Sequence, residues 1–538
     1  MVRDNAVKMS SQVGQEEARA APTLYNSDLG AAKSVAGTVR VTTLRKLFSF
    51  PVFLGALLIA GVFLAISLRL QDVAGELPGH NHPSFVEGDT WWHVAVGEQI
   101  ISTLTWPTTN HFSFTAPDSE WIAYEWLGEV TMALASRCAG FKGMLVLLLV
   151  LASAIVLLLY YYAYLRSGSV KAACAAAAIL LPLVGTCFTL RPQLLGYIFI
   201  LITLICLEQF RQGRWKSLWM LPGLFVLWVN THGTFVLGLL ALLVYWASGL
   251  IDLRSNGVWT ERWTRAQRLH LEIIFLLSVL ALAITPYGTR LIGYVLNMAF
   301  FQPVNLANIE EWQPLAFNQV FGKVFLGLVL LFLLAQVIWR FKYRVEELAL
   351  LLFALYSACV HQRFLPFFGV IFAPILARML APWTPPYRPS KDRYALNAVL
   401  IVLFLTGIAG LFPSQNQLRQ LIADNYPVGA IEYLREHPVP GPMLNEHSWG
   451  GYLIRALGPG HKVFIDGRED AYEPAGVFAD YLDITRLKPN TLSLLRKYGV
   501  RSCLIERDAP LATLLQSLPQ WQKVYGDEVS SVLVRSPR

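Results

Sequence analysis

Residues 48–70 read FSFPVFLGALLIAGVFLAISLRL, and this stretch decides the class of fold. It is long enough for a helix to cross the hydrocarbon core of a bilayer and to stay there as an anchor, rather than to be removed as a signal peptide. Of the 538 residues, 55% are apolar and 15% are charged, and the mean hydropathy is +0.46. These values exclude an ordinary soluble domain and indicate a polytopic membrane protein.

The remaining bulk properties add little to this class. Residues 1–46 are polar, rich in Ser, Ala and Thr and without apolar periodicity, so we expect a disordered cytoplasmic tail. The net charge of +8 does not indicate nucleic acid as a partner, because most basic residues lie in short loops between apolar segments. The six cysteines show no metal or redox spacing and are expected to be small core residues.

Further apolar segments follow the first and predict about eleven transmembrane helices within residues 47–413. The predicted spans are 48–70, 142–165, 172–190, 194–210, 217–229, 234–251, 271–285, 320–339, 345–360, 364–380 and 394–412. Basic clusters precede the first span and follow each even-numbered span; they are Arg40, Arg45 and Lys46, Arg166 and Lys171, Arg211, Arg214 and Lys216, Arg254, Arg262, Arg265 and Arg268, Arg340, Lys342 and Arg344, and Arg388, Lys391 and Arg393. The positive-inside rule therefore places the N-terminus in the cytoplasm and everything after Phe412 outside.

The first outer loop, residues 71–141, is predicted to carry two interfacial helices. Residues 90–104 place Trp92, Val96 and Ile100 on one stripe, and residues 120–137, EWIAYEWLGEVTMALASR, again show helical spacing. We expect the indole rings to lie at headgroup depth. Each helix has a carboxylate near its start, and an acid beside lipid is costly unless it faces a polar cavity. Asp89 therefore has two interpretations, an N-cap alone or a catalytic or ligand-binding group.

The outer loops together hold most of the chemically capable residues near the membrane. They contain Glu125 and Glu129, Arg191, His232, Glu310 and Glu311, and His361 with Arg363. This distribution predicts that any chemistry takes place on the extracytoplasmic face.

The first loop, GDTWWHVAVGEQI followed by FSFTAPDSEWIAYEWLGEV, resembles a bacterial branch of the GT-C superfamily of integral-membrane glycosyltransferases, akin to the protein mannosyltransferase and Rgt-type groups. The segments RPQLLGYIFILI, LWVNTHGTFVLG and HQRFLPFFGVIFAP resemble later signatures of the same branch. The likeness covers about residues 45 to 415 in architecture, and the first loop in motif. Many members carry an Asp-Glu pair where this chain has Asp89 followed by Thr90.

The resemblance implies inverting transfer of a sugar from a polyprenyl-phosphate donor to a glycan, lipid or protein acceptor in the cell envelope. Asp89 is then the expected base that removes the acceptor's proton, with His93 and Glu125 as further catalytic candidates. Arg191 and Arg363, with His232 and His361, are expected to bind the donor phosphate. The alternatives are arginines that extend to lipid phosphates and ordinary loop histidines. No cofactor is certain, and a divalent cation remains an alternative.

Residues 424–538 predict a small extracytoplasmic α/β domain, because helical and strand patterns alternate and favour a largely parallel sheet. KVFIDGR, residues 462–468, is predicted as a strand. Asp466 and Arg468 at its end are either an acceptor-binding pair at the ligand edge of the sheet or a buried ion pair that positions a loop.

Three function classes remain open at this point. The first is a membrane glycosyltransferase of the bacterial cytoplasmic membrane. The second is a transporter of lipid-linked sugars, which would favour mid-membrane charges and repeated halves, and the acids here cluster in one outer loop instead. The third is an envelope assembly or sensing protein whose α/β domain binds a partner.

Overall fold

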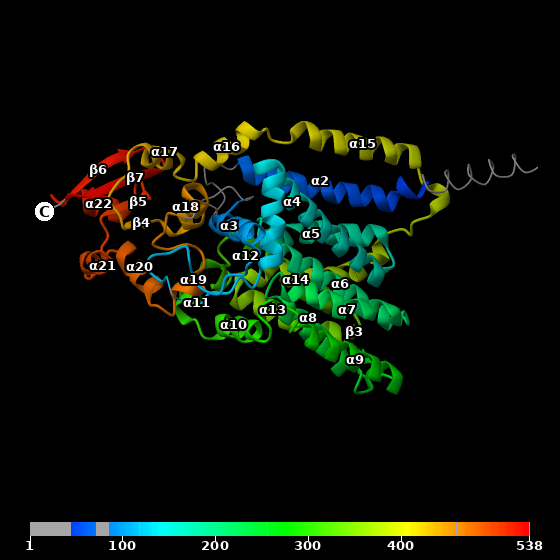
Figure 1. Ribbon diagram of the computed structural model, residues 1–538. Helices are drawn as coiled ribbons and strands as arrows, with labels where there is room; N and C mark the ends of the chain where they lie inside the picture. The colour runs from blue at the N-terminus through cyan, green and yellow to red at the C-terminus, as the bar shows by residue number, and fades with distance from the viewer. Residues whose placement is uncertain are drawn as a thin grey trace, which may run out of the picture.

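The computed structural model describes residues 45–71, 86–117, 119–255, 257–339, 341–458 and 460–536. Long apolar helices form one end of the molecule, and the small mixed domain of the C-terminal residues forms the other (Figure 1). The predicted cytoplasmic tail, residues 1–46, lies outside the described residues except for its last two.

Each of the eleven predicted apolar segments is a helix or part of one. The helices are α2 (Phe50–Gln71), α4 (Trp126–Ser167), α5 (Val170–Val184), α6 (Gln193–Arg211), α7 (Leu221–Val229) after the 3-10 turn η2 (Trp215–Met220), α8 (Phe235–Ser248), α9 (Arg265–Ala281), α12 (Val320–Ile338), α13 (Val345–Val360), α14 (Leu365–Leu380) and α15 (Tyr394–Leu411). In the described residues, seven helices are long and apolar enough to cross a membrane by length and composition, and 215–229 and 235–248 are shorter apolar helices.

The shorter elements connect and frame these helices. They are η1 (Gly185–Cys187), β1 (Leu253–Arg254), β2 (Val258–Thr260), α10 (Arg290–Phe300), α11 (Pro303–Asn308), η3 (Glu310–Trp312), β3 (Tyr343–Arg344), η4 (Gln362–Phe364), η5 (Ala381–Trp383) and η6 (Pro389–Lys391). Strand β2 pairs antiparallel with β1 and parallel with β3.

The two helices predicted in the first outer loop are present. The first is α3 (Gly88–Thr103), and the second is the beginning of α4, which continues into the apolar part after a break at Ala139 and Gly140. Gly140 has φ +58°, a conformation that glycine adopts without the steric cost of a Cβ. Because of this break, the part of α4 before it belongs to the first outer loop and the part after it belongs to the apolar bundle.

The indole rings expected at lipid headgroups are covered by protein. Trp91 and Trp92 are 1% and 6% exposed, and α3 packs between α4 and the C-terminal domain. The Trp91 ring lies edge-on to those of Tyr426 and Tyr452, at centroid distances of 5.5 Å and 5.0 Å. An apolar stripe on a helix identifies a face that is shielded from water. Here protein packs on that face, where lipid was expected.

Several basic residues that the sequence analysis used for orientation belong to a largely buried ionic network. Glu208 binds Arg166 at 3.1 Å and Arg344 at 3.0 Å. Glu346, which is fully buried, binds Arg211 at 2.5 Å, and Glu347 binds both Arg378 and Arg166. These pairs join α4, α6, α13 and α14, so the arginines hold helix ends together in addition to adding positive charge.

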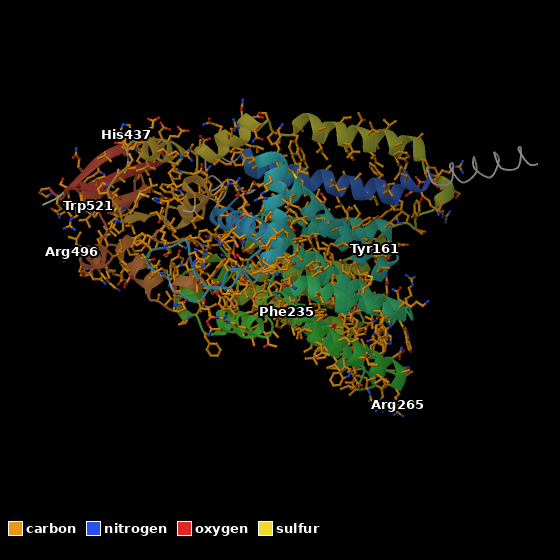
Figure 2. The ribbon with its side chains drawn as sticks, viewed as in Figure 1. Tyr161, Phe235, Arg265, His437, Arg496 and Trp521 are labelled. Atoms are coloured by element: carbon orange, nitrogen blue, oxygen red, sulfur yellow. The ribbon has the colours of Figure 1, made fainter. Side chains whose placement is uncertain are left out.

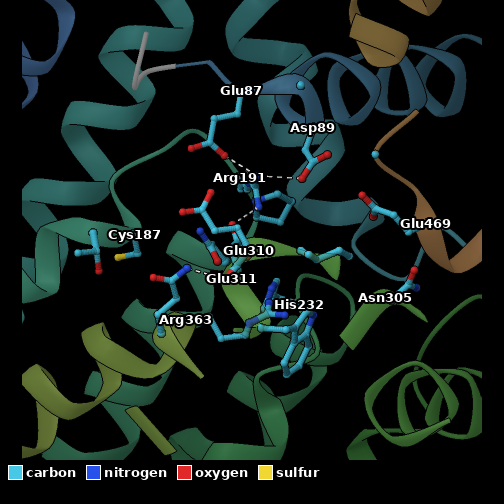
Figure 3. Close-up of a pocket in the computed structure, with 18 of the residues that line it drawn as sticks. Glu87, Asp89, Cys187, Arg191, His232, Asn305, Glu310, Glu311, Arg363 and Glu469 are labelled. Atoms are coloured by element: carbon cyan, nitrogen blue, oxygen red, sulfur yellow. Dashed lines mark hydrogen bonds and ion pairs between the residues drawn. The ribbon is translucent and has the colours of Figure 1, made fainter. Parts of the chain in front are cut away.

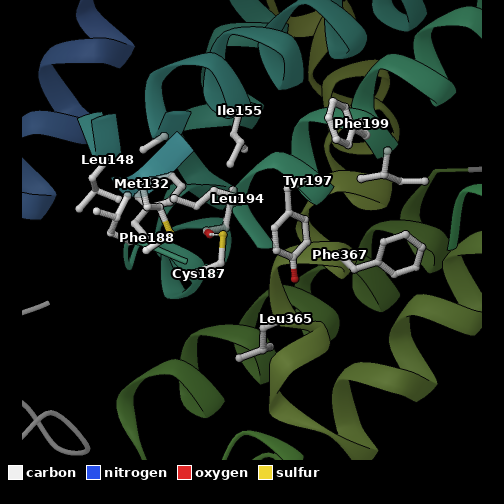
Figure 4. Close-up of a cluster of buried hydrophobic side chains, with 14 of the residues drawn as sticks. Met132, Leu148, Ile155, Cys187, Phe188, Leu194, Tyr197, Phe199, Leu365 and Phe367 are labelled. Carbon is white, nitrogen blue, oxygen red and sulfur yellow. Dashed lines mark hydrogen bonds between the residues drawn. The ribbon is translucent and has the colours of Figure 1, made fainter. Parts of the chain in front are cut away.

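The apolar core reaches the end of the bundle that faces the C-terminal domain. Figure 4 shows side chains of α4, η1, α6 and α14 packed together, among them Met132, Phe188 and Leu194. Tyr197 and Leu365 belong to the same core and also border the cavity described below. The site is therefore built directly on a close-packed helical base.

The C-terminal domain contains helices α16 (Gln415–Ala423), α17 (Val428–Glu436), α18 (Gly450–Leu457), α19 (Glu469–Tyr472), α20 (Val477–Thr485), α21 (Thr491–Lys497) and α22 (Pro510–Gln516), the turn η7 (His447–Trp449), and strands β4 (Met443–Asn445), β5 (Ser502–Glu506), β6 (Trp521–Gly526) and β7 (Ser530–Arg535). The strand order is β4-β5-β7-β6. The α/β class is confirmed, but β4–β5 is the one parallel pair in this sheet and the expectation of a largely parallel sheet was wrong.

The predicted strand at 462–468 does not join that sheet. Val463 instead forms an isolated bridge with Ser113 of the first outer loop, and the Thr115 hydroxyl donates to the Phe464 carbonyl at 2.5 Å. On α18, Arg455 donates to the Ser136 hydroxyl at 2.9 Å. The C-terminal domain is thus bound closely to the first outer loop.

Candidate functional site

A cavity of about 500 Å³ lies where the helical bundle meets the C-terminal domain. Its polar lining residues come from the start of α3, the segments before α4 and α6, and the C-terminal domain. Its apolar lining residues include Leu306, Ile309, Phe321, Leu365 and Pro366. The cavity therefore offers both charged groups and apolar surface.

Arg191 stands at the centre of a group of three carboxylates, and Figure 3 shows Glu87 and Asp89 directed toward it. It contacts Asp89 at 3.0 Å, Glu311 at 2.7 Å and Glu87. The guanidinium of Arg191 thus already forms ion pairs with carboxylates of the protein. Burial raises the pKa of Glu311, but the charges of Arg191 and Arg363 outweigh it and leave that pKa below its ordinary value.

The start of α3 is fixed by Thr90, which explains how Asp89 reaches Arg191. The Thr90 hydroxyl accepts from the Glu87 amide at 3.0 Å and donates to the Leu190 carbonyl at 3.0 Å. Glu87 is the N-cap, so the interpretation of Asp89 as the cap was wrong. Asp89 lies in the first turn, where its carboxylate accepts from the Trp92 indole at 3.1 Å and faces the cavity.

The C-terminal domain contributes one wall of the cavity, through His447, Ser448, Gly467, Glu469 and Asp470. A Cβ on Gly467 would come within 1.9 Å of an Asp89 oxygen, so this approach requires glycine. His447 lies 2.9 Å from Glu469. Burial lowers the pKa of His447, but contacts with Glu469 and the charge of Asp89 outweigh it and raise that pKa to about 9.

Glu125 lies between two histidines at the mouth of a buried cluster. It is 3.3 Å from His232 and 3.6 Å from His93, and the other nitrogen of His93 is 3.3 Å from Glu129. Burial, with the charges of Asp470 and Asp89, raises the pKa of Glu125 to about 8.

Both histidines are disfavoured as cations by the same environment. Burial, followed by the charge of Arg363, lowers the pKa of His232 to about 3. Burial and the charge of Arg191 hold the pKa of His93 well below its ordinary value. The cluster therefore contains neutral imidazoles next to a carboxyl group that retains its proton at neutral pH.

Arg363 is the second cation of the cavity and has a different environment from Arg191. Its guanidinium stacks on the Trp312 ring at 4.1 Å, and its backbone carbonyl accepts from the Tyr197 hydroxyl at 3.2 Å. In the described part of the chain, no carboxylate lies within 4.0 Å of this guanidinium. Arg363 is thus available to bind an anion, whereas Arg191 is committed to carboxylates.

Two candidate assignments need correction. His361 does not border the cavity, since its Nδ1 contacts the Trp312 carbonyl at 2.6 Å and its ring packs on Trp312. It supports the aromatic ring on which Arg363 stacks. Asp466 and Arg468 are paired with each other at 0% and 1% exposure, so they cannot contact an acceptor as placed.

The Asp466–Arg468 pair holds a loop instead. Arg468 donates to both oxygens of Asp466, at 2.7 Å and 2.6 Å, and to Asn110 of the first outer loop at 3.0 Å. The residues around the pair, Gly467 and Asp470, are the ones that reach the cavity.

Sequence reasoning assigned no role in the site to Glu87, Glu311, His447, Glu469 or Asp470. The pair Glu310-Glu311 in an outer loop was a usable signal, since acids near lipid favour a polar cavity. His447 and Glu469 lie far from the first loop in sequence, and no local pattern could connect them to it. Among the described residues, no group of three or more His, Cys, Asp or Glu side chains is arranged to hold a metal ion.

Comparison with known proteins found structural likeness alone. No family model matches the chain, and no curated protein matches it in sequence. The chain is similar to the Archaeoglobus fulgidus oligosaccharyltransferase tethered with an acceptor peptide, with 11% identity, coverage of 83% of this chain and 69% of that one, and a TM-score of 0.47.

It is also similar to ArnT from Cupriavidus metallidurans. In the apo state that protein shows 13% identity, coverage of 90% of this chain and 99% of that one, and a TM-score of 0.47. Bound to undecaprenyl phosphate it shows 14% identity, the same coverage and a TM-score of 0.44.

Proposed function

We propose that this protein transfers a sugar from a polyprenyl-phosphate donor to an acceptor of the cell envelope, on the extracytoplasmic face of the bacterial cytoplasmic membrane. The observation that carries the proposal is the cavity itself, which joins an arginine free of carboxylates, Arg363, to the carboxylate of Asp89 at the outer end of an apolar bundle. The resemblance of the outer loops to the GT-C superfamily supports the same activity.

The two kinds of lining residue suit the two parts of such a donor. Apolar residues such as Leu306 and Phe321 suit the first units of the prenyl chain, and Arg363 suits its phosphate. His232 also borders the cavity and can act as a neutral hydrogen-bond donor. Arg191 then serves to neutralise and orient the carboxylates, in place of the phosphate contact expected from the sequence.

Asp89 is the proposed general base. The acceptor hydroxyl attacks the anomeric carbon, its proton passes to Asp89, and the bond from that carbon to the phosphate oxygen breaks with inversion. Arg191 and the Trp92 indole hold the carboxylate in place, which favours a fixed direction of attack. The wall formed by His447, Ser448 and Glu469 lies beside Asp89 and is the proposed position of the acceptor.

The test is transfer of labelled sugar in membranes supplied with polyprenyl-phosphate sugars. Asp89→Asn keeps the shape and removes the base, so we expect the transfer rate to fall by about 10²–10⁴-fold. Asp508→Asn, an exposed site on the C-terminal domain, is the matched control and should retain the wild-type rate. An unchanged rate in Asp89→Asn would remove Asp89 as the base, and a wild-type protein that binds these lipids without consuming them would instead favour transport.

A further inference from the structure

Four titratable side chains form a continuous row from the cavity into the protein interior. In order they are His232, Glu125, His93 and Glu129, with separations of 3.3 Å, 3.6 Å and 3.3 Å. The first three border the cavity, and Glu129 lies behind them at 1% exposure. The base mechanism proposed above uses His232 alone of this row and gives Glu125, His93 and Glu129 no role.

The hydrogen-bond pattern fixes the proton positions at the outer end of the row. The Thr234 amide donates to Nδ1 of His232 at 3.1 Å, so that nitrogen is an acceptor. In a neutral imidazole the proton then resides on Nε2, which points at Glu125. This Nε2 lies 3.3 Å from one oxygen of Glu125.

The inner end of the row requires one additional proton. Both nitrogens of His93 face carboxyl groups, but a neutral imidazole has a single N–H to donate. A carboxylic acid on either glutamate provides a donor near the other nitrogen, at 3.3 Å from Glu129 or 3.6 Å from Glu125. If both glutamates were ionised, two buried negative charges would lie on either side of a neutral ring with no positive charge between them.

We propose that Glu125 is a general acid, which gives its proton to the departing lipid phosphate, and that His93, His232 and Glu129 are positioning residues that hold this proton on Glu125. This inference rests on the proposed sugar transfer and adds a second carboxyl group to it. The two carboxyls then have opposite roles, Asp89 as base and Glu125 as acid, set by their different surroundings.

The step is balanced in protons and charge. The acceptor oxygen forms a bond to the anomeric carbon, and its proton goes to Asp89. The bond from that carbon to the phosphate oxygen breaks, the phosphate takes the electron pair, and the proton of Glu125 binds to the phosphate. Return of the proton from Asp89 to Glu125 restores the starting state.

The many acidic groups of the cavity explain why the departing phosphate needs the proton of Glu125. Seven carboxyl groups border the cavity, namely Glu87, Asp89, Glu125, Glu310, Glu311, Glu469 and Asp470, together with the two arginines Arg191 and Arg363. A departing phosphate without a proton gains a second negative charge beside these carboxyls. Protonation by Glu125 keeps the phosphate at one negative charge and eases its departure.

The surroundings of Glu125 favour the acid form in the resting protein. Burial and the charges of Asp470 and Asp89 raise its pKa to about 8, which the charges of Arg363 and Arg191 lower only in part. Titratable and charged groups from every neighbouring element surround Glu125 and the row. The acidic groups are Asp89 of α3, Glu129 of α4 and Asp470 of the C-terminal domain, and the histidines are His93 of α3 and His232 before α8. The arginines are Arg191 before α6, Arg363 of η4 and Arg468 of the C-terminal domain, and the tyrosines are Tyr124, next to Glu125 in the chain, and Tyr294 of α10.

The test is the pH dependence of transfer by the full-length protein in lipid nanodiscs. A general acid works when protonated, so the wild-type rate should fall as the pH rises through about 8. Glu125→Gln should lower the rate at pH 7 by about 10²–10³-fold and remove this alkaline limb. Glu120→Gln, an exposed site in the same loop, is the matched control and should keep the wild-type profile.

Two further measurements separate acid catalysis from a merely structural role. A donor analogue fluorinated next to its phosphate has a more acidic leaving group and needs less protonation, so the deficit of Glu125→Gln should shrink several-fold with it. Glu129→Gln keeps a hydrogen-bonding group beside His93 and leaves Glu125 in place, so the alkaline limb should remain.

Infrared spectroscopy gives a readout that does not depend on activity. The wild-type protein at pH 7 should show the C=O band of a protonated carboxyl group, which Glu125→Gln should remove and Glu120→Gln should retain. Retention of the band or of the alkaline limb in Glu125→Gln would overturn the acid assignment while the sugar transfer stands. Failure of the wild-type protein to transfer any sugar would overturn the proposed function and this inference with it.

Discussion

At the scale of single residues, the arrangement around Arg363 differs from that around Arg191 in a way that can be measured. Arg191 contacts three carboxylates, whereas Arg363 stacks on Trp312 and leaves its N–H groups to the cavity. A guanidinium held against an aromatic ring loses little further freedom when it binds a phosphate. The two arginines should thus respond differently to mutation.

We expect Arg363→Ala to weaken the binding of polyprenyl phosphate by about 10- to 100-fold, because a hydrogen bond to a charged group contributes about 1.5–3 kcal/mol. The measurement is titration of the protein in nanodiscs with a labelled lipid phosphate. Arg290→Ala is the control, since Arg290 is half exposed and paired with Glu120. Equal affinities in the two variants would show that Arg363 does not contact the phosphate.

Individual residues of the site could be predicted from the sequence only in part. Asp89, His93, Glu125, Arg191, His232 and Arg363 were singled out because polar groups beside apolar segments are costly without a reason, and all six border one cavity. Their partners were not predictable. The capping role of Glu87, the pairing of Arg191 with Glu311 and the approach of Gly467 to Asp89 depend on contacts between segments far apart in sequence.

At the scale of helices, the contact of α3 with α4 determines the geometry of the row from Glu125 to Glu129. A Cβ on Gly97 would lie 2.2 Å from the Glu129 carbonyl oxygen, so the two helices approach closely only because this position is glycine. His93 lies one turn before Gly97 on the same face, and the close approach brings its ring to Glu129.

Gly97→Val should therefore separate α3 from α4 and destabilise the protein by about 1–3 kcal/mol, the usual cost of overpacking. The measurement is thermal unfolding in nanodiscs, with the pH profile of transfer as a second readout. Gly327→Ala is the control, because a Cβ there meets no atom of the described chain within 4 Å and alanine favours the helix. Similar unfolding temperatures for wild type and Gly97→Val would contradict this account.

Helices were the elements that the sequence predicted best. All eleven apolar segments and both loop helices are helical, because long apolar runs and 3.6-residue spacing have few other solutions. The strand expected at 462–468 failed because its partner is Ser113 of the outer loop, outside its own domain. The cover of Trp91 and Trp92 by protein was not predicted, because spacing identifies an apolar face without identifying what packs on it.

At the scale of the whole molecule, the charge and the domain arrangement give an orientation that can be tested. The ionic network and the predicted cytoplasmic loops lie at one end of the helices, and the C-terminal domain lies at the other; Arg265 and Arg496 mark the two ends in Figure 2. The positive-inside rule assigns the first end to the cytoplasm.

Labelling with a membrane-impermeant thiol reagent should follow this orientation. All six cysteines are described, and Cys138 is the exposed one, so Cys138→Ala provides a suitable background. In intact spheroplasts, Ser517→Cys on the C-terminal domain should react and Ser255→Cys in the loop after α8 should not. Both should react after the membrane is opened, and the reverse pattern in intact cells would invert the topology.

Helix α12 borders the site but is covered by little protein. Protein buries 11% of the most apolar 18-residue stretch of α12, although Phe321 and Gly322 at the beginning of this helix border the cavity. Acyl chains are then the main packing neighbours of this helix, and their length and order set the lateral pressure on one cavity wall. Membrane composition becomes a variable of the site's shape, and measurements in micelles and in native lipid should be compared with that in mind.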